Sequence, residues 1–394
     1  MKKYLPIYDR EWAKRRTASK RNRIRKKRSI FDGKSSIVVN GKTLQTLFNK
    51  PIYEVPRILD ISGGQLTNEL KTFFDGLEEL CEKFDRIYLT FKKTEVARYP
   101  MYLIIVAIQE KYGTKISVMW SDSPGINYQI STTGFYLASH KRREMMRNSN
   151  IGQIPVISGS NQEFGDLADD LVDAISDKYY DGSMPSEVEF KISQAIIETV
   201  ENVGRHAYPH VNDNHDKKWW LICSIGDTDY DDGKHMFLAI YDTGRGIPMS
   251  FEDSHVFQHR VKSHYPEEYN RLIQGSEATD NKKNVVRALL RTAKSIFKPL
   301  RETIGDSGMI YASMMHEVTR IDDQNHGQGS ISIKDVVTDD PGSHLIITSD
   351  KGWYQYDKGA KNEDGMDDEH SLRELANSMP GTFIQWSIKL HDFD

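Results

Sequence analysis

The chain has 394 residues, of which 28% are charged and 38% apolar, and its formal net charge at pH 7 is −4. This length allows two domains that each bury a core, and no run of about 18 apolar residues is present to cross a bilayer. The only cysteines, Cys81 and Cys223, exclude a disulfide framework, so we expect a cytoplasmic protein with no membrane partner.

The charge is distributed unevenly along the chain. Residues 1–36 form a basic arm with 14 Lys and Arg against three acidic residues, a net charge near +11. Such an arm suits nucleic acid, bound through residues 1–34, or an acidic protein surface. A solvated tail has the same composition, and both interpretations stay open.

Residues 37–125 alternate short apolar strands with amphipathic helices, which predicts a small α/β domain. The expected strands are 36–40, 57–61, 86–91 and 115–120, and the expected helices are 66–84 and 99–112. This order resembles the STAS domain, the regulatory partner of anti-sigma-factor kinases. STAS domains carry a phosphorylatable serine where residues 94–100 lie here, and this stretch has no serine, so we expect a docking or scaffolding domain.

Residues 126–160 are rich in Ser, Gly, Asn and Arg and are predicted to be a linker before a second domain, residues 161–394. The pattern then predicts a helix at 164–180 and strands at 218–225 and 236–241.

A polar stripe marks the stretch from Glu198 to Tyr208. Glu198, Asn202 and His206 are spaced i, i+4 and i+8 and share one face of a helix. The apolar residues that would anchor this helix on a sheet are Val188, Ile192, Ile196, Val200, Val203 and Ala207. A carboxylate and an amide facing one cavity suit a site that binds a metal–phosphate and activates a nucleophile. The alternative is an amphipathic helix with a solvated polar face.

Three glycine turns follow in the chain. Asp242-Thr-Gly244-Arg-Gly246 comes after an apolar strand, where glycines let the backbone approach a planar ligand and the Asp accepts a hydrogen bond. Gly327-Gln-Gly329 opens an expected helix and suits phosphate. Gly381-Thr382 begins a last strand, residues 383–390.

Together these four motifs, in this order, resemble the GHKL superfamily of ATPases, which includes gyrase B-type topoisomerases, histidine kinases and anti-sigma-factor serine kinases. The resemblance covers roughly residues 160–394, and the E-x3-N-x3-H-A-Y form is most similar to the anti-sigma serine kinases. It implies an α+β two-layer sandwich in which residues 250–326 form a long helical lid over the nucleotide. The compact anti-sigma kinases have a shorter lid.

The resemblance also implies roles on the phosphate side of the site. Asn202 would bind Mg²⁺, and Gly327 and Gly329 would wrap the phosphates with backbone N–H groups. Glu198 would accept a proton from the group that attacks the γ-phosphate, and His206 would pack or contact phosphate.

On the base side, the resemblance implies that Asp242 accepts the adenine amino group. Gly244 and Gly246 would give room for the base, and Thr382 would support the contact. The expected cofactors are therefore ATP and Mg²⁺.

Three functions remain open. The first is an ATPase whose lid opens and closes to control a partner in bacterial signalling or defence. The second is a serine/threonine protein kinase of the anti-sigma type, and the third is a scaffold that holds ATP without turnover, which an intact Glu198 disfavours. We expect a protein partner at the lid and the STAS-like domain, and a homodimer is possible.

Overall fold

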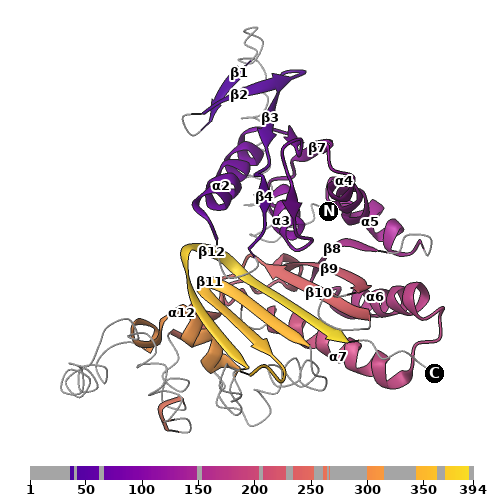
Figure 1. Ribbon diagram of the computed structural model, residues 1–394, viewed down its shortest axis with the longest axis vertical. Coiled ribbons are helices and arrows are strands. Elements are labelled where there is room, and N and C mark those ends of the chain that lie inside the picture. The colour runs from indigo at the N-terminus through magenta and orange to yellow at the C-terminus, as the bar shows by residue number, and fades with distance from the viewer. Residues whose placement is uncertain are drawn as a thin grey trace, which may run out of the picture. The chain divides into compact units, whose positions relative to one another are not determined.

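The computed structural model describes residues 36–39, 42–61, 66–148, 153–203, 207–227, 234–252, 261–263, 266, 300–314, 343–361 and 369–389. The chain forms two compact units, which lie within residues 1–60, 69–97 and 105–129 and within residues 61–68, 98–104 and 130–394. Both combine strands with helices, which confirms the α/β class (Figure 1). Within the described residues, no helix is long and apolar enough to cross a membrane.

The first unit is built on a five-stranded mixed sheet of order β1-β2-β3-β5-β7. Its strands are β1 (Ser36–Val39), β2 (Lys42–Leu47), β3 (Lys50–Glu54), β5 (Arg86–Thr90) and β7 (Lys115–Met119). The first three strands pair antiparallel, and β3, β5 and β7 pair parallel. Parallel neighbours need crossover connections, which contain the helices α2 (Asn68–Lys83) and α3 (Met101–Tyr112) predicted from the sequence.

One strand prediction for this unit differs from the structure. The segment 57–61 contributes only β4 (Ile58–Leu59), which pairs with β6 (Val96–Ala97) in a separate two-stranded sheet. The parallel strands instead begin with β3. Its second residue is Pro51, and because proline lacks a backbone N–H, its presence argues against a strand in the sequence.

The second unit is built on an antiparallel sheet of order β11-β12-β10-β9-β8. Its strands are β8 (Ile154–Ser160), β9 (Lys218–Asp227), β10 (Lys234–Asp242), β11 (His344–Asp357) and β12 (His370–Lys389). Its principal helices are α6 (Phe164–Tyr179), α7 (Ser186–Asn202) and α12 (Leu300–Ser313). These helices share one hydrophobic core with alternating residues of the strands, such as Leu238 and Ile240 of β10. Because side chains alternate along a strand, this core covers one face of the sheet.

The described parts of the predicted linker, residues 126–148 and 153–160, are largely helix and strand. They hold most of α4 (Pro124–Thr133), together with α5 (Ser139–Met146) and all of β8, in which every residue is buried. The buried Arg142 of α5 donates from Nε to the Val156 carbonyl oxygen at 2.6 Å and so ties α5 to β8. Some of the polar residues that suggested a linker, such as Arg142 and Ser160, are therefore buried, whereas Arg147 is exposed.

Most of the predicted lid, residues 250–326, lies outside the described residues, and the last strand differs from the prediction. The helix α12 lies inside the range 250–326 but packs in the core of the unit, with Ile310 fully buried. The last strand starts at His370 rather than Phe383 and pairs with β11, which the sequence pattern did not predict.

Gly159 of β8 gives a test of this packing. A Cβ at Gly159 would lie 2.4 Å from Cζ2 of Trp219 on the neighbouring strand, so the buried indole must shift. We expect Gly159→Ala to lower the free energy of unfolding by about 1–3 kcal/mol, measured by urea denaturation with tryptophan fluorescence. Gly165→Ala is the matched control, because among the described residues its Cβ would meet no heavy atom within 4 Å. In α6 this change should be neutral or stabilise by up to about 1 kcal/mol. Equal effects would contradict the packing argument.

Candidate functional site

The antiparallel register aligns one residue from each strand at one end of the second sheet. The row is Gly159, Trp219, Asp242, Thr382 and Ser349, each paired with the next. Asp242 lies two residues beyond the core residue Ile240, and side chains two apart point to the same face. The polar members of the row therefore face the side of the sheet that packs against α7.

Asp242 is a buried carboxylate, with 4% of its surface exposed. The Gly244 N–H donates to its Oδ1 at 2.7 Å, and the Thr382 backbone N–H also binds the carboxylate. Burial raises the pKa of Asp242 to about 7, because desolvation disfavours the charged form more than the two N–H groups stabilise it. Asp242 therefore changes charge near neutral pH, and a further N–H donor would favour its ionised form.

Glycines bring the turn after β10 against the segment that follows α7. The Arg245 N–H donates to the Ala207 carbonyl oxygen at 2.9 Å. A Cβ at Gly244 would lie 2.4 Å from that same oxygen, so a larger residue would push the two segments apart. Gly246 has φ +84°, in the left-handed region that glycine tolerates best.

A serine joins this turn to the other two strands. Ser349 Oγ accepts from the Ile247 N–H at 2.9 Å and donates to the Gly381 carbonyl oxygen at 2.9 Å. It also lies 3.1 Å from Thr382 Oγ1. Thr382 thus lies beside Asp242. The sequence did not point to Ser349, because no local motif marks it.

Tyr208 is a second residue whose role only the structure reveals. Its hydroxyl donates to the Lys218 carbonyl oxygen at 2.7 Å and accepts from the Thr243 N–H at 3.1 Å. Burial raises the pKa of this phenol, which therefore stays neutral. Tyr208 fastens the segment after α7 to the start of β9 and to the turn beyond Asp242.

The C-terminal turn of α7 is fixed at this same end of the sheet. Asn161, which follows β8, donates from Nδ2 to the Val200 carbonyl oxygen at 2.9 Å. Asn202 is the last residue of α7, Glu198 lies one turn earlier, and both are half-buried. The structure therefore brings these two residues to the end of the unit that holds Asp242.

The remaining predicted site residues, His206, Gly327 and Gly329, lie outside the described residues. A glycine turn that the sequence analysis missed occurs in α12, where Gly305 has φ +73° and interrupts the helix. The helix resumes at Asp306, and both the N–H and the hydroxyl of Ser307 donate to Glu374 Oε1 at 2.8 Å. The sequence feature that could have predicted this turn is Gly305-Asp-Ser-Gly308 directly before an apolar run. Here a carboxylate of the protein itself caps the resumed helix.

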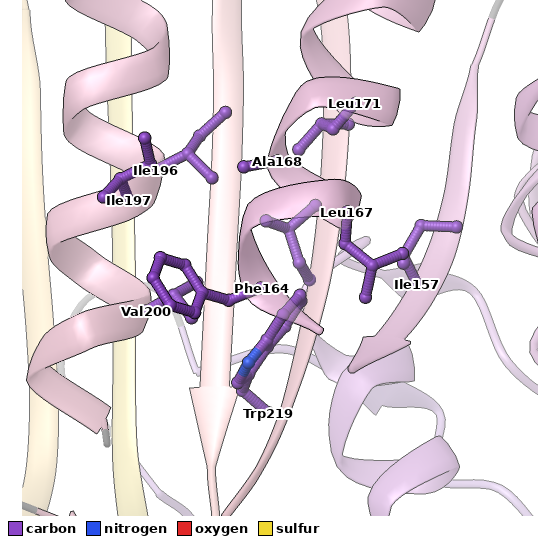
Figure 2. A pocket seen from close by; sticks show the side chains of 10 residues that line it. Ile157, Phe164, Leu167, Ala168, Leu171, Ile196, Ile197, Val200 and Trp219 are labelled. Carbon is purple, nitrogen blue, oxygen red and sulfur yellow. The ribbon is translucent and has the colours of Figure 1, made fainter. Parts of the chain in front are cut away.

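A small gap lies between α6, α7 and the strands β8 and β9, as Figure 2 shows. Its volume is about 10 Å³, close to the least that holds one water molecule. Its lining is apolar and includes Phe164, Leu167, Val200 and Trp219. We interpret it as imperfect packing beneath α7, because it offers a ligand neither room nor charged partners.

Comparison with known proteins adds no assignment: no protein-family model, no curated protein and no solved structure matches the chain. The candidate site therefore rests on its own geometry.

The raised pKa of Asp242 gives a test without a ligand. A carboxyl group whose pKa is about 7 when folded and 3.8 when unfolded keeps its proton longer in the folded state. Its contribution to stability is therefore lost as pH rises from about 4 to about 7 and then stays level. Asp242→Asn removes this titration, so the unfolding free energy of the wild type minus that of the variant should fall between pH 5 and 7. A difference independent of pH would contradict the raised pKa.

Proposed function

We propose that the second unit binds ATP with Mg²⁺ and that the protein is an ATPase whose nucleotide state controls a partner protein. The observation that carries this proposal is the buried Asp242 carboxylate at the end of β10. It lies between the glycine turn 244–246 and Thr382 of β12. The order of motifs resembles the GHKL superfamily and supports the same function.

Asp242 suits the recognition of a base that carries an exocyclic amino group. Its ionised carboxylate accepts hydrogen bonds only, so an adenine amino group is a favourable partner. The carbonyl oxygen that guanine carries at the same ring position would face a second acceptor and be repelled. The Thr382 hydroxyl, 3.1 Å from Ser349 Oγ, adds a group that can donate or accept beside it.

The end of α7 suits the phosphates. The Asn202 amide oxygen is a ligand that Mg²⁺ accepts, and Glu198 is one turn away to accept a proton from an attacking hydroxyl or water. Among the described residues, no group of three or more His, Cys, Asp or Glu is arranged to hold a metal ion. This fits a magnesium ion that takes most of its ligands from phosphate oxygens and water, and the bound ion would neutralise phosphate charge.

The finer fold assignment is part of the proposal. The second unit, an antiparallel sheet with helices packed on one face, fits the two-layer sandwich of the GHKL type. The first unit, with its parallel β3, β5 and β7, fits a STAS-like docking domain for the partner.

Asp242→Asn tests nucleotide recognition. The Asn side chain keeps the size but adds an NH₂ donor that opposes the adenine amino group, so we expect ATP binding to be lost in calorimetry with Mg²⁺ present. The control is Asp213→Asn, an exposed residue whose Oδ1 only accepts from the His215 N–H. A wild type that does not bind ATP would refute the proposed function.

Glu198→Ala separates binding from turnover. We expect ATP affinity to change by a few-fold at most and release of γ-phosphate to fall by about 10²–10⁴, the usual contribution of a positioned base. Asn202→Ala should reduce both, because it loosens the metal. Glu189→Ala, at an exposed position of the same helix, is the control. In this assay the ATP carries a label on its γ-phosphate. Transfer of the label to a partner protein, rather than its release as free phosphate, would identify the protein as a kinase.

A further inference from the structure

The short helix α8 (Ile247–Glu252) borders the candidate site directly after the glycine turn. An isolated helix of six residues is unstable in water, because nucleation costs more than so few hydrogen bonds return. α8 therefore depends on contacts with other elements at both ends. At its first residue, the Ile247 N–H is held by Ser349 Oγ.

Arg301 holds the other end. Its Nη1 donates to Glu252 Oε2 at 2.9 Å, and its Nη2 donates to Asp306 Oδ2 at 3.1 Å. The same Nη2 also pairs with Asp350 of β11. The Arg301 side chain is 21% exposed, so it is partly shielded from solvent. One side chain thus joins the end of α8, the first turns of α12 and a central point of β11.

Asp350 connects this cluster to the candidate site. It follows Ser349 directly, has φ +52° and lies where the pairing of β11 with β12 changes register. The Lys351 N–H donates to Asp306 Oδ2 at 3.0 Å, so the backbone beyond the kink is also tied to the cluster. Ser349 and Arg301 therefore fasten the two ends of α8 to adjacent positions of one strand.

We propose that Arg301 is a positioning residue that fixes α8 against β11 and thereby holds the Gly246–Ile247 side of the candidate site in place. Its effect on a ligand rests on the proposed function, whereas its effect on α8 does not.

The charges predict what happens without Arg301. Three carboxylates, those of Glu252, Asp306 and Asp350, surround one guanidinium. Removing the cation leaves like charges close together on three different elements, and they repel each other in a partly shielded setting. Arg301→Gln should therefore push α8 away rather than only release it. Neutralising Glu252 in that background should reduce the repulsion.

Apolar contacts keep the variant folded. Phe251 of α8 packs against a small core formed by residues of α12, among them Leu300, Ile304 and Met309. This core does not include Arg301. We therefore expect Arg301→Gln to remain folded, with an unfolding temperature below that of the wild type.

Hydrogen exchange without ligand tests the proposal directly. In Arg301→Gln, the amides of α8 should exchange about tenfold faster or more, while those of β9 and β10 keep their rates. The double variant Arg301→Gln with Glu252→Gln should recover part of the protection. Arg147→Gln is the matched control, because Arg147 forms an exposed ion pair with Asp170 in the same unit. Unchanged exchange in α8, or no recovery in the double variant, would overturn the proposal.

Two further measurements keep the outcome decisive. If Arg301→Gln does not fold, Glu252→Gln alone weakens the tie between α8 and Arg301 at a side chain that is 38% exposed, and it should speed exchange in α8 several-fold. If the wild type binds ATP, Arg301→Gln should weaken binding about tenfold, with partial recovery in the double variant. Equal ATP affinity of the two proteins would refute the positioning role, whereas a wild type that binds no ATP would refute only the proposed function.

Discussion

Burial of the Asp242 carboxylate is the constraint on which the arrangement of the site depends. A buried charge is costly unless hydrogen bonds compensate it, and here the backbone N–H groups of Gly244 and Thr382 do so only in part. One donor comes from the turn after β10 and the other from β12, so the turn and the strand must both approach the carboxylate closely. The raised pKa is the electrostatic consequence of this incomplete compensation.

Close approach of three backbone segments explains the glycines around Asp242. A Cβ at Gly381 would lie 1.9 Å from the Asp242 carbonyl oxygen, and one at Gly246 would lie 2.8 Å from Ser349 Oγ. With Gly244 against Ala207, three glycines allow β10, β12 and the segment after α7 to meet at one point. In the sequence such glycines suggest room for a ligand. In the structure they allow segments of the chain itself to approach one another closely.

The Asp242 carboxylate and the carboxylates around Arg301 are compensated by different means. Asp242 relies on backbone N–H groups, which leaves its remaining acceptor capacity for a further donor. The carboxylates around Arg301 rely on a guanidinium, whose planar donors are engaged by several partners at once. The first arrangement suits recognition of a ligand, whereas the second suits fixing elements relative to each other.

Apolar residues at helical spacing in the sequence predicted α2, α6 and α7, and short apolar runs predicted α3 and the strands β5, β7, β9 and β10. The sequence pattern did not reveal β3, β8 or β11. Pro51 in β3 and Gly159 in β8 are residue types that disfavour strands, and these segments become strands through pairing with their neighbours. The sequence also identified Asp242, Gly244, Gly246 and Thr382 singly, each within a short motif. Only the tertiary structure placed Asp242 between Thr382 and Trp219 and added Ser349, Tyr208 and Arg301. The physical reason is that strand register pairs residues as far apart in the chain as Asp242 and Thr382, and no local pattern encodes that pairing.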